Sequence, residues 1–337
     1  MKKFIELLKV EQVALIRKAS ATFNLSALTI EKDFWVTYLL DVVFNRLDLN
    51  HDYTFKGGTS LSKCFNLIER FSEDIDLSLN MGDLGFGEGE KNPMADPKPS
   101  RAKLDKIRKD LEKAGTDFVR DKLLPGIDSK LKEDDVRAYS LYIGDNGADI
   151  YFEYPRVLRD IEYPVNNYVT PRVLIETGTK AMHNPYTITE IDAMCVKGLL
   201  DAVKVKVLSP QRTFWEKITI LHAENNINDP GRVKDRFSRH IYDIHQIYRS
   251  EIGVKAIKNT DLLADVAKHK GRMFIKAAAK YDEACKPTLK VALTDEIRDA
   301  MAKDYEKMTD MFYRGEKPSF EELLDTLQQI DDNFNNH

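Results

Sequence analysis

The feature that most constrains the fold is a pair of aspartates two residues apart. Asp74 directly precedes residues 75–79, IDLSL, where apolar and polar side chains alternate, and Asp76 lies within them. Alternation with period two is typical of a strand with one buried face. Both carboxylates then lie on the face opposite Ile75 and Leu77. Two like charges so close require a counter-charge, and oxygen-rich clusters suit Mg²⁺ or Mn²⁺.

A double glycine stands upstream of this strand. Residues 53–56 are β-prone and run into Gly57 and Gly58. Thr59 or Ser60 can then cap a helix that extends to about position 68. The Gly-Gly turn leaves backbone N–H groups free to approach an anion, and the positive end of the helix points to the same place. The nucleotide-binding residues expected here are Gly57, Gly58, Thr59, Ser60 and Lys63.

Each part of this pattern has an ordinary structural reading when it stands alone. An Asp-x-Asp pair is usually the solvated face of a strand, and a double glycine is usually a plain turn. The whole combination is more specific, because it sets a phosphate cradle beside a pair of metal-binding acids. Phosphoryl transfer from a nucleotide requires both.

The rest of the chain indicates two kinds of structure. Further β candidates follow the aspartate pair, and after about residue 198 the pattern favours helices alone. This order predicts an α+β protein, with a small mixed β-sheet flanked by helices in residues 1–200 and a helical bundle in residues 201–337. The further β candidates are residues 137–143, 148–154 and 172–177.

A loop rich in glycine and proline separates the aspartate pair from a long helix. Residues 82–100 hold four glycines and three prolines, which excludes a helix or a central strand. Because the loop follows the aspartate strand directly, we expect its base to lie beside the catalytic face. Ser100 is a fair N-cap for a helix to about residue 124, and Pro125-Gly126 is expected to end that helix.

Composition narrows the function classes. The chain has 337 residues, with 51 basic and 55 acidic side chains and a net charge of −4. Residues 197–249 differ from this average, with ten basic and six acidic residues, which suits an anionic ligand or a solvated helical surface. No run is apolar enough for a membrane span. Three separated cysteines favour a reduced, cytoplasmic protein.

The motifs resemble those of a known family. Residues 57–60 with residues 72–77 are similar to the first motif of the nucleotidyltransferase superfamily related to DNA polymerase β. Residues 56–63 and 70–77 resemble, more narrowly, the AbiEii/AbiGii toxins. This resemblance implies a nucleotidyltransferase fold and transfer of a nucleoside monophosphate from an NTP. It also implies a divalent cation held by Asp74, Asp76 and a third carboxylate.

Two residues compete for the third carboxylate. Residues 172–177, RVLIET, resemble the second motif of the family and favour Glu176, which would also activate the acceptor. Glu153, in residues 149–153, is the alternative. Either residue could instead be a solvent-facing strand residue.

Two further motifs fall in the helical region. Residues 209–222 resemble the third motif and residues 236–244 the fourth, which implies that Lys217 contacts the nucleotide phosphates and that Asp243 orients it. Lys217 shares a helix face with apolar neighbours, where a lysine needs an anion or a route to water. A structural ion pair between Lys217 and Asp243 is therefore the alternative, and both readings can hold together.

The resemblance also implies a biological role. Its members are toxins of type IV toxin–antitoxin and abortive-infection systems, so we expect a cognate antitoxin, a part in phage defence and an RNA or tRNA acceptor. Two other functions stay open. One is a nucleotide-binding regulator that acts through its antitoxin with little transfer activity, and the other is transfer onto a protein or small molecule.

Overall fold

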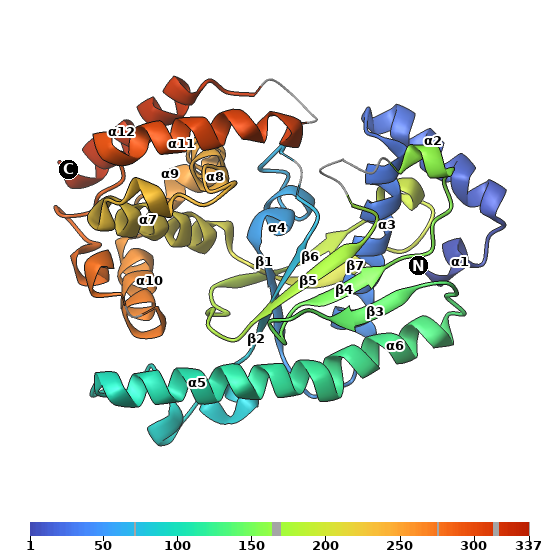
Figure 1. Cartoon of the computed structure of the whole chain (residues 1–337), viewed down its shortest axis with the longest axis horizontal. Coiled ribbons are helices and arrows are strands. Elements are labelled where there is room, and N and C mark those ends of the chain that lie inside the picture. Colours follow the sequence, from blue (N-terminus) through green and yellow to red (C-terminus); the bar gives the residue numbers. More distant parts are fainter. Residues whose placement is uncertain (71, 164–169, 275, 313–316, 337) are drawn as a thin grey trace. The chain divides into compact units, whose positions relative to one another are not determined.

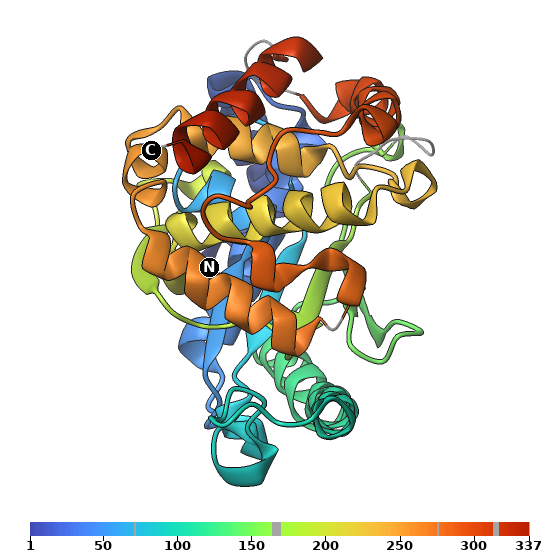
Figure 2. The ribbon, with the colours of Figure 1, turned by 90° about the vertical axis from the view of Figure 1, so that its left-hand side faces the viewer.

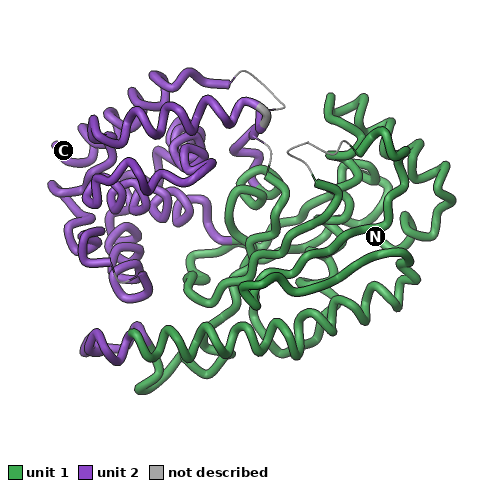
Figure 3. Tube along the Cα trace, viewed as in Figure 1, with its two compact units in different colours: residues 1–64, 72–92, 105–207 green, residues 65–71, 93–104, 208–337 purple. Residues whose placement is uncertain are grey.

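The computed structural model describes residues 1–70, 72–163, 170–274, 276–312 and 317–336 (Figure 1). The chain forms two compact units, coloured green and purple in Figure 3. Unit 1 comprises Met1–Cys64, Ser72–Asn92 and Asp105–Val207, and unit 2 comprises Phe65–Phe71, Pro93–Leu104 and Leu208–His337. The division at residues 200 and 201 stays a prediction; the units change over at Val207, and two earlier segments belong to unit 2.

Unit 1 is built on one mixed sheet of seven strands in the order β3-β4-β5-β2-β1-β7-β6. With the helices around it, this sheet confirms the predicted α+β class. The strands are β1 (Tyr53–Lys56), β2 (Ile75–Leu79), β3 (Ser140–Ile143), β4 (Ile150–Glu153), β5 (Val173–Gly178), β6 (Tyr186–Ile191) and β7 (Val203–Leu208).

The centre of the sheet carries the aspartate strand. β2 pairs antiparallel with β1 and parallel with β5, so it has a neighbour on each side. Ile75 and Leu77 are fully buried, as the alternation predicts, and they belong to the face that also buries Ile175 of β5. A buried central strand holds its register firmly, because a slip of one residue would turn every side chain to the opposite face.

Helices cover the sheet of unit 1. The most buried is α3, whose Trp35 packs edge-on against Phe152 of β4 with ring centroids 5.4 Å apart. The helices of this unit are α1 (Lys2–Ile5), α2 (Lys9–Phe23), α3 (Ala27–Asp41), α4 (Gly57–Lys63), α6 (Leu124–Glu133) and most of α5 (Arg101–Phe118).

Three adjacent charged residues of α3 are buried or nearly so. Glu31 accepts hydrogen bonds from Val157 N at 2.8 Å and from the Tyr163 hydroxyl at 2.7 Å. Burial raises the pKa of Glu31, and these hydrogen bonds oppose the shift. Lys32 forms an ion pair with Glu73, and Asp33 forms one with Lys63.

Two predicted helix ends are wrong. The helix after the double glycine begins at Gly57 rather than after Thr59 or Ser60, and it ends at Lys63. The Ser60 hydroxyl does not cap the helix; it donates to the Gly57 carbonyl inside it at 2.8 Å. Pro125 does not end the second helix either. A π-helical turn at 119–123 joins α5 to α6, and Pro125 lies in the first turn of α6, where its missing N–H is not needed.

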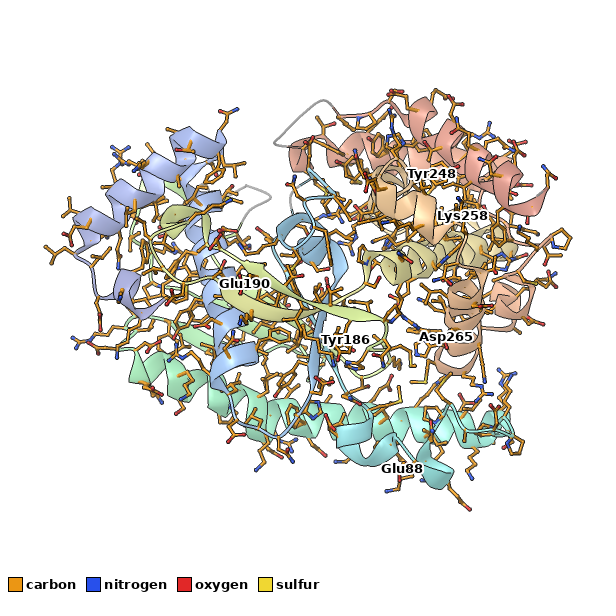
Figure 4. The ribbon with its side chains drawn as sticks, turned by 180° about the vertical axis from the view of Figure 1, so that it is seen from behind. Glu88, Tyr186, Glu190, Tyr248, Lys258 and Asp265 are labelled. Atoms are coloured by element: carbon orange, nitrogen blue, oxygen red, sulfur yellow. The ribbon has the colours of Figure 1, made fainter. Side chains whose placement is uncertain are left out.

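The expectation of helices alone after residue 198 is also wrong. Val203, Val205 and Val207 of β7 are buried and alternate with Lys204 and Lys206, which is a plain strand pattern. β6 lies beside β7 at the end of the sheet, and Figure 4 shows its exposed residues Tyr186 and Glu190. Residues 192–202, which include a 3-10 helix at Met194–Val196, separate β6 from β7, so the two strands do not form a short hairpin.

Unit 2 is helical in the described residues. Trp215 of α7 is fully buried, packs against Phe334 of α12 and donates to the Ala256 carbonyl at 3.1 Å. Figure 2 shows α7 in yellow and α12 in dark red. The helices are α7 (Pro210–Ile227), α8 (Arg239–Tyr248), α9 (Glu251–Ala256), α10 (Thr260–Met273), α11 (Asp295–Lys307) and α12 (Phe320–Asn335). Within the described residues of the chain, no helix is long and apolar enough to cross a membrane.

Buried histidines link the stability of both units to pH. Nδ1 of His183 in unit 1 lies 2.7 Å from the Thr54 hydroxyl. In unit 2, Nδ1 of His222 accepts a hydrogen bond from the backbone N–H of Lys290 at 3.0 Å. Burial lowers the pKa of both imidazoles, which are therefore neutral in the folded protein near neutral pH.

We expect the free energy of unfolding to be fully developed above about pH 6.5 and to fall below it, because the unfolded chain then takes up protons that the buried imidazoles exclude. Each such histidine contributes a slope of up to about 1.4 kcal/mol per pH unit. Urea unfolding at about pH 7.5 and about pH 5.5 measures the loss. His183→Gln should reduce it, and an unchanged loss in that variant would contradict this account.

Candidate active site

The register of β1, β2 and β5 brings two of the predicted acids together, Asp76 and Glu176. Asp76 lies opposite Lys56 of β1 on one side and opposite Glu176 of β5 on the other. Directly opposite residues point to the same face of a sheet, so Asp76 and Glu176 are neighbours on one face. Lys56 Nζ lies 3.7 Å from Asp76 Oδ1, and the Asp76 side chain is 24% exposed.

Asp74 immediately precedes β2 and is half-buried. Its neighbour Glu73 forms an ion pair with Lys32 of α3, whose Nζ lies 2.5 Å from Glu73 Oε2 and 3.0 Å from the Thr170 carbonyl oxygen. Glu73 and Asp74 both lie before the strand begins, so a common face for Asp74 and Asp76 stays a prediction. Phe71, which belongs to the same motif, lies outside the described residues.

Lys32 is almost fully buried. Burial lowers its pKa, and the charges of Glu73 and Asp74 oppose that shift. This lysine therefore places a positive charge close to the start of β2.

Glu153 lies farther from the aspartates than Glu176 does. It is on β4, which β5 separates from β2, and it pairs with Ser140 of β3. The Tyr142 hydroxyl donates to its Oε1 at 3.2 Å. The register therefore favours Glu176 as the partner of Asp76, although the role of third carboxylate stays a prediction for both residues.

Gly57 makes close contact with Asp76. Its φ is +79°, a left-handed conformation, and a Cβ added there would lie 1.8 Å from Asp76 Oδ2. Only glycine adopts this conformation freely and allows that approach. Nearby, the Thr59 hydroxyl lies 3.0 Å from the Ser72 hydroxyl, a contact that joins the start of α4 to the segment leading into β2.

Lys63 lies at the other end of α4 and has a structural ion pair. Its Nζ lies 2.5 Å from Asp33 Oδ1 and 3.0 Å from the Asp192 carbonyl oxygen, and its side chain is buried. Asp33 also accepts a hydrogen bond from Met194 N at 2.8 Å. This geometry ties α4 to α3 and does not support the predicted nucleotide contact of Lys63.

The base of the glycine- and proline-rich loop is not where the sequence predicted it. Residues 82–100 follow the end of β2 at Leu79, whereas Asp74 precedes its start. Five strand residues span about 16 Å, so the base of the loop and Asp74 lie at opposite ends of the strand.

The donors of this face fit a divalent cation in their chemistry. Carboxylate oxygens are the ligands that Mg²⁺ prefers, and adjacent strands supply them side by side from Asp76 and Glu176. Across the residues that the structure describes, however, no three histidine, cysteine or acidic side chains converge as a metal-binding group. A metal shared by Asp74, Asp76 and Glu176 therefore stays a prediction.

Unit 2 holds the other two predicted residues in one buried cluster. Lys217 of α7 lies 2.9 Å from an oxygen of Asp243 on α8, so the ion pair considered from the sequence is present. Arg70 binds the same carboxylate with two hydrogen bonds of 2.7 Å. Nζ of Lys217 also lies 3.3 Å from His240 Nδ1. Arg70 and Lys217 thus share one buried carboxylate.

The cluster has strong effects on ionisation. Burial alone would raise the pKa of Asp243, but the charges of Arg70 and Lys217 outweigh it and hold that pKa well below its usual range. Burial lowers the pKa of Lys217, and repulsion from Arg70 adds to the shift. Burial and the charge of Lys217 lower the pKa of His240, which is therefore neutral and accepts from the lysine.

Sequence reasoning missed three residues of these two clusters. Arg70 was noted only as part of a motif, and its partner Asp243 is far away in the sequence. Lys32 lies with Glu31 and Asp33 between apolar stretches of α3, a signal for buried charges that pair with other segments. Lys56 directly precedes the double glycine, but its position opposite Asp76 depends on the register.

Comparisons with known proteins identify the family of this chain. A profile of the family described as "Nucleotidyl transferase AbiEii toxin, Type IV TA system" matches residues 38–326. Seven chains of known structure are similar. One is MenT4, a nucleotidyltransferase toxin from Mycobacterium tuberculosis H37Rv, with 12% identity and a TM-score of 0.44 over 94% of this chain and 98% of that chain. No curated protein matches.

The protein is a nucleotidyltransferase. It belongs to the AbiEii family, the nucleotidyltransferase toxins of type IV toxin–antitoxin systems, which confirms the resemblance found in the motifs. At 12% identity the likeness to MenT4 is distant, and no residue role is carried over from it.

Gly57→Ala should displace the Asp76 carboxylate and abolish most transfer activity. Gly85→Ala is a matched control, because Gly85 has a φ of +84° but open space around its missing Cβ. Both variants should lose about 1–2 kcal/mol of stability from backbone strain. Only Gly57→Ala should also lose activity, measured as release of pyrophosphate. Equal activity in the two variants would contradict a role for this close approach.

Proposed function

We propose that this toxin transfers a nucleoside monophosphate from an NTP to RNA, with tRNA as the favoured acceptor, in a reaction that depends on Mg²⁺ or Mn²⁺. The observation that carries the proposal is the register that sets Asp76 beside Glu176, with Gly57 against the Asp76 carboxylate. Membership of a nucleotidyltransferase family supplies the reaction class.

In this proposal Asp74, Asp76 and Glu176 hold the cation, which supplies positive charge opposite the triphosphate when bound. Glu176 accepts the proton of the acceptor hydroxyl. That oxygen then forms a bond to the α-phosphorus while the bond from the α-phosphorus to its bridging oxygen breaks, and pyrophosphate leaves. The backbone of Gly57 and Gly58 approaches the phosphates, as the family motif implies.

In the same proposal, Lys217 binds the triphosphate. Arg70 already binds both oxygens of Asp243, so the charge of Lys217 is not needed to neutralise that carboxylate. An anionic ligand stabilises a buried ammonium group such as that of Lys217. Asp243 then acts as a positioning residue, because it orients Lys217 from 2.9 Å.

We further propose that the protein acts in the cytoplasm, opposed by a cognate antitoxin, as part of phage defence. The free cysteines Cys64, Cys195 and Cys285 suit a reducing compartment. The family description supplies the antitoxin, because a type IV system pairs each toxin with one.

Asp76→Asn should reduce transfer more than about a hundredfold while the protein stays folded, because the amide keeps the size of the side chain but loses its charge. Glu176→Gln should have a similar effect, and Glu153→Gln should have little. The measurement is incorporation of each α-labelled NTP into total RNA, followed by digestion with ribonuclease or protease. Circular dichroism confirms folding.

The outcome of this assay separates the alternatives. A label that only protease releases, or one found on a small molecule, would reject the RNA acceptor. Binding of NTP without any labelled product would favour the regulatory alternative. Loss of activity in Glu153→Gln but not in Glu176→Gln would reverse the assignment of the third carboxylate.

Lys217→Met and Asp243→Asn should separate binding from stability. Lys217→Met leaves Asp243 paired with Arg70, so its stability should change by less than about 1 kcal/mol while NTP affinity falls. Asp243→Asn leaves two buried cations without their anion and should cost about 3–5 kcal/mol. Thermal unfolding and equilibrium NTP binding measure the two effects. Normal NTP affinity in Lys217→Met would remove this lysine from the nucleotide site.

A further inference from the structure

The segment between α7 and α8, together with Arg239 at the start of α8, is an exposed, basic part of unit 2. Residues 232–239, called the basic loop here, carry one acidic residue, Asp235, and four basic ones. All four basic side chains are exposed. The loop is therefore strongly positive within a chain whose net charge is −4. Its basic residues are Arg232, Lys234, Arg236 and Arg239.

A buried carboxylate fixes the shape of this loop. Asp304 of α11 is only 5% exposed and accepts hydrogen bonds from Arg236 N at 2.6 Å, Ser238 N at 2.8 Å and the Ser238 hydroxyl at 2.6 Å. Arg236 has a φ of +65°, a left-handed conformation that is strained for a residue with a side chain. Strained residues persist where the surroundings hold them, and they gather at functional sites.

The charges of the loop are only partly balanced. Arg232 lies 3.8 Å from Glu224, and the single acid, Asp235, lies 3.6 Å from Lys307. Among the described residues, the structure gives neither Lys234 nor Arg239 a carboxylate partner within ion-pair distance. The side chains of Lys234 and Arg239 can therefore bind an external anion.

The loop is continuous with the cluster around Lys217. The ring of Phe237 packs edge-on against His240, with centroids 5.2 Å apart, and His240 contacts Lys217. Arg239 also adds to the positive charge around Lys217 and His240. An anionic chain bound along the loop would therefore lead to the side chain that we propose for the triphosphate.

We propose that the basic loop binds the phosphate backbone of the RNA acceptor. This inference rests on the proposed function, because it assigns a place to its acceptor. Arginine forks bind phosphate oxygens in pairs, and a loop already fixed by Asp304 loses little conformational freedom on binding. Three of the four basic residues are arginines. The contacts are to phosphates, so they position RNA without reading its sequence.

The test compares two pairs of substitutions. One protein carries Lys234→Ala and Arg239→Ala, and the control carries Lys255→Ala and Lys258→Ala, which remove the same charge from exposed positions elsewhere in unit 2 (Lys258 is labelled in Figure 4). Binding of a fluorescein-labelled RNA hairpin with a single-stranded 3′ end is followed by anisotropy at several salt concentrations.

The two loop substitutions should weaken RNA binding. They should also make the plot of log affinity against log salt less steep, by about 0.7–0.9 for each lost phosphate contact. The control pair should leave the slope unchanged. Equal effects in the two pairs would overturn the proposal. So would displacement of the RNA by polyglutamate as readily as by unlabelled RNA, because the loop would then suit an acidic protein.

This binding assay is independent of the transfer assay. RNA binding that depends on the loop, together with transfer onto another acceptor, would support the loop assignment and reject the proposed function. Transfer onto RNA, together with an unchanged RNA affinity of the protein that carries Lys234→Ala and Arg239→Ala, would support the proposed function and reject the loop assignment. Thermal unfolding of both paired variants excludes a folding defect.

Discussion

Burial of charge on α3 is the constraint on which the structure of unit 1 depends. A buried ion is tolerated only when it is paired and hydrogen-bonded. Glu31 therefore binds the chain after β4, Lys32 binds Glu73 before β2, and Asp33 binds Lys63 at the end of α4. Three consecutive residues thus fix three separate segments, two of which precede the aspartate pair. The helix therefore holds Glu73, the residue directly before Asp74.

The same rule shapes unit 2, with a different balance. One carboxylate, Asp243, is shared by Arg70 and Lys217. Arg70 belongs to a short segment that directly precedes Ser72 and the aspartate strand in the sequence. Asp243 therefore has two effects: it binds Arg70 in the segment that precedes Ser72, and it holds the charge of Lys217 inside the helical unit. A structural ion pair and a role in nucleotide binding are compatible in such a cluster.

The sequence allowed much of the site to be predicted, because its central features are local. The limits of β1 and β2, and the position of Asp76 on the side of β2 opposite Ile75 and Leu77, follow from patterns over a few residues. The position of Glu176 opposite Asp76 and the partners of Arg70 and Lys63 could not be predicted, because they depend on the register of distant segments. β7 was not predicted, although its apolar and polar residues alternate plainly. Pro125 was wrongly predicted to end a helix, because a π-helical turn at 119–123 lets the chain continue into α6.

The parallel pairing of β2 with β5 has a consequence for how the protein is made. Parallel strands cannot be joined by a tight turn, and contacts between distant segments form late because loop closure costs entropy before they are gained. Asp76 and Glu176 belong to strands that the ribosome delivers at different times. A nascent chain that ends before β5 therefore carries the aspartates without their neighbour. The face that carries Asp76 beside Glu176 is therefore complete only after most of unit 1 has been synthesised.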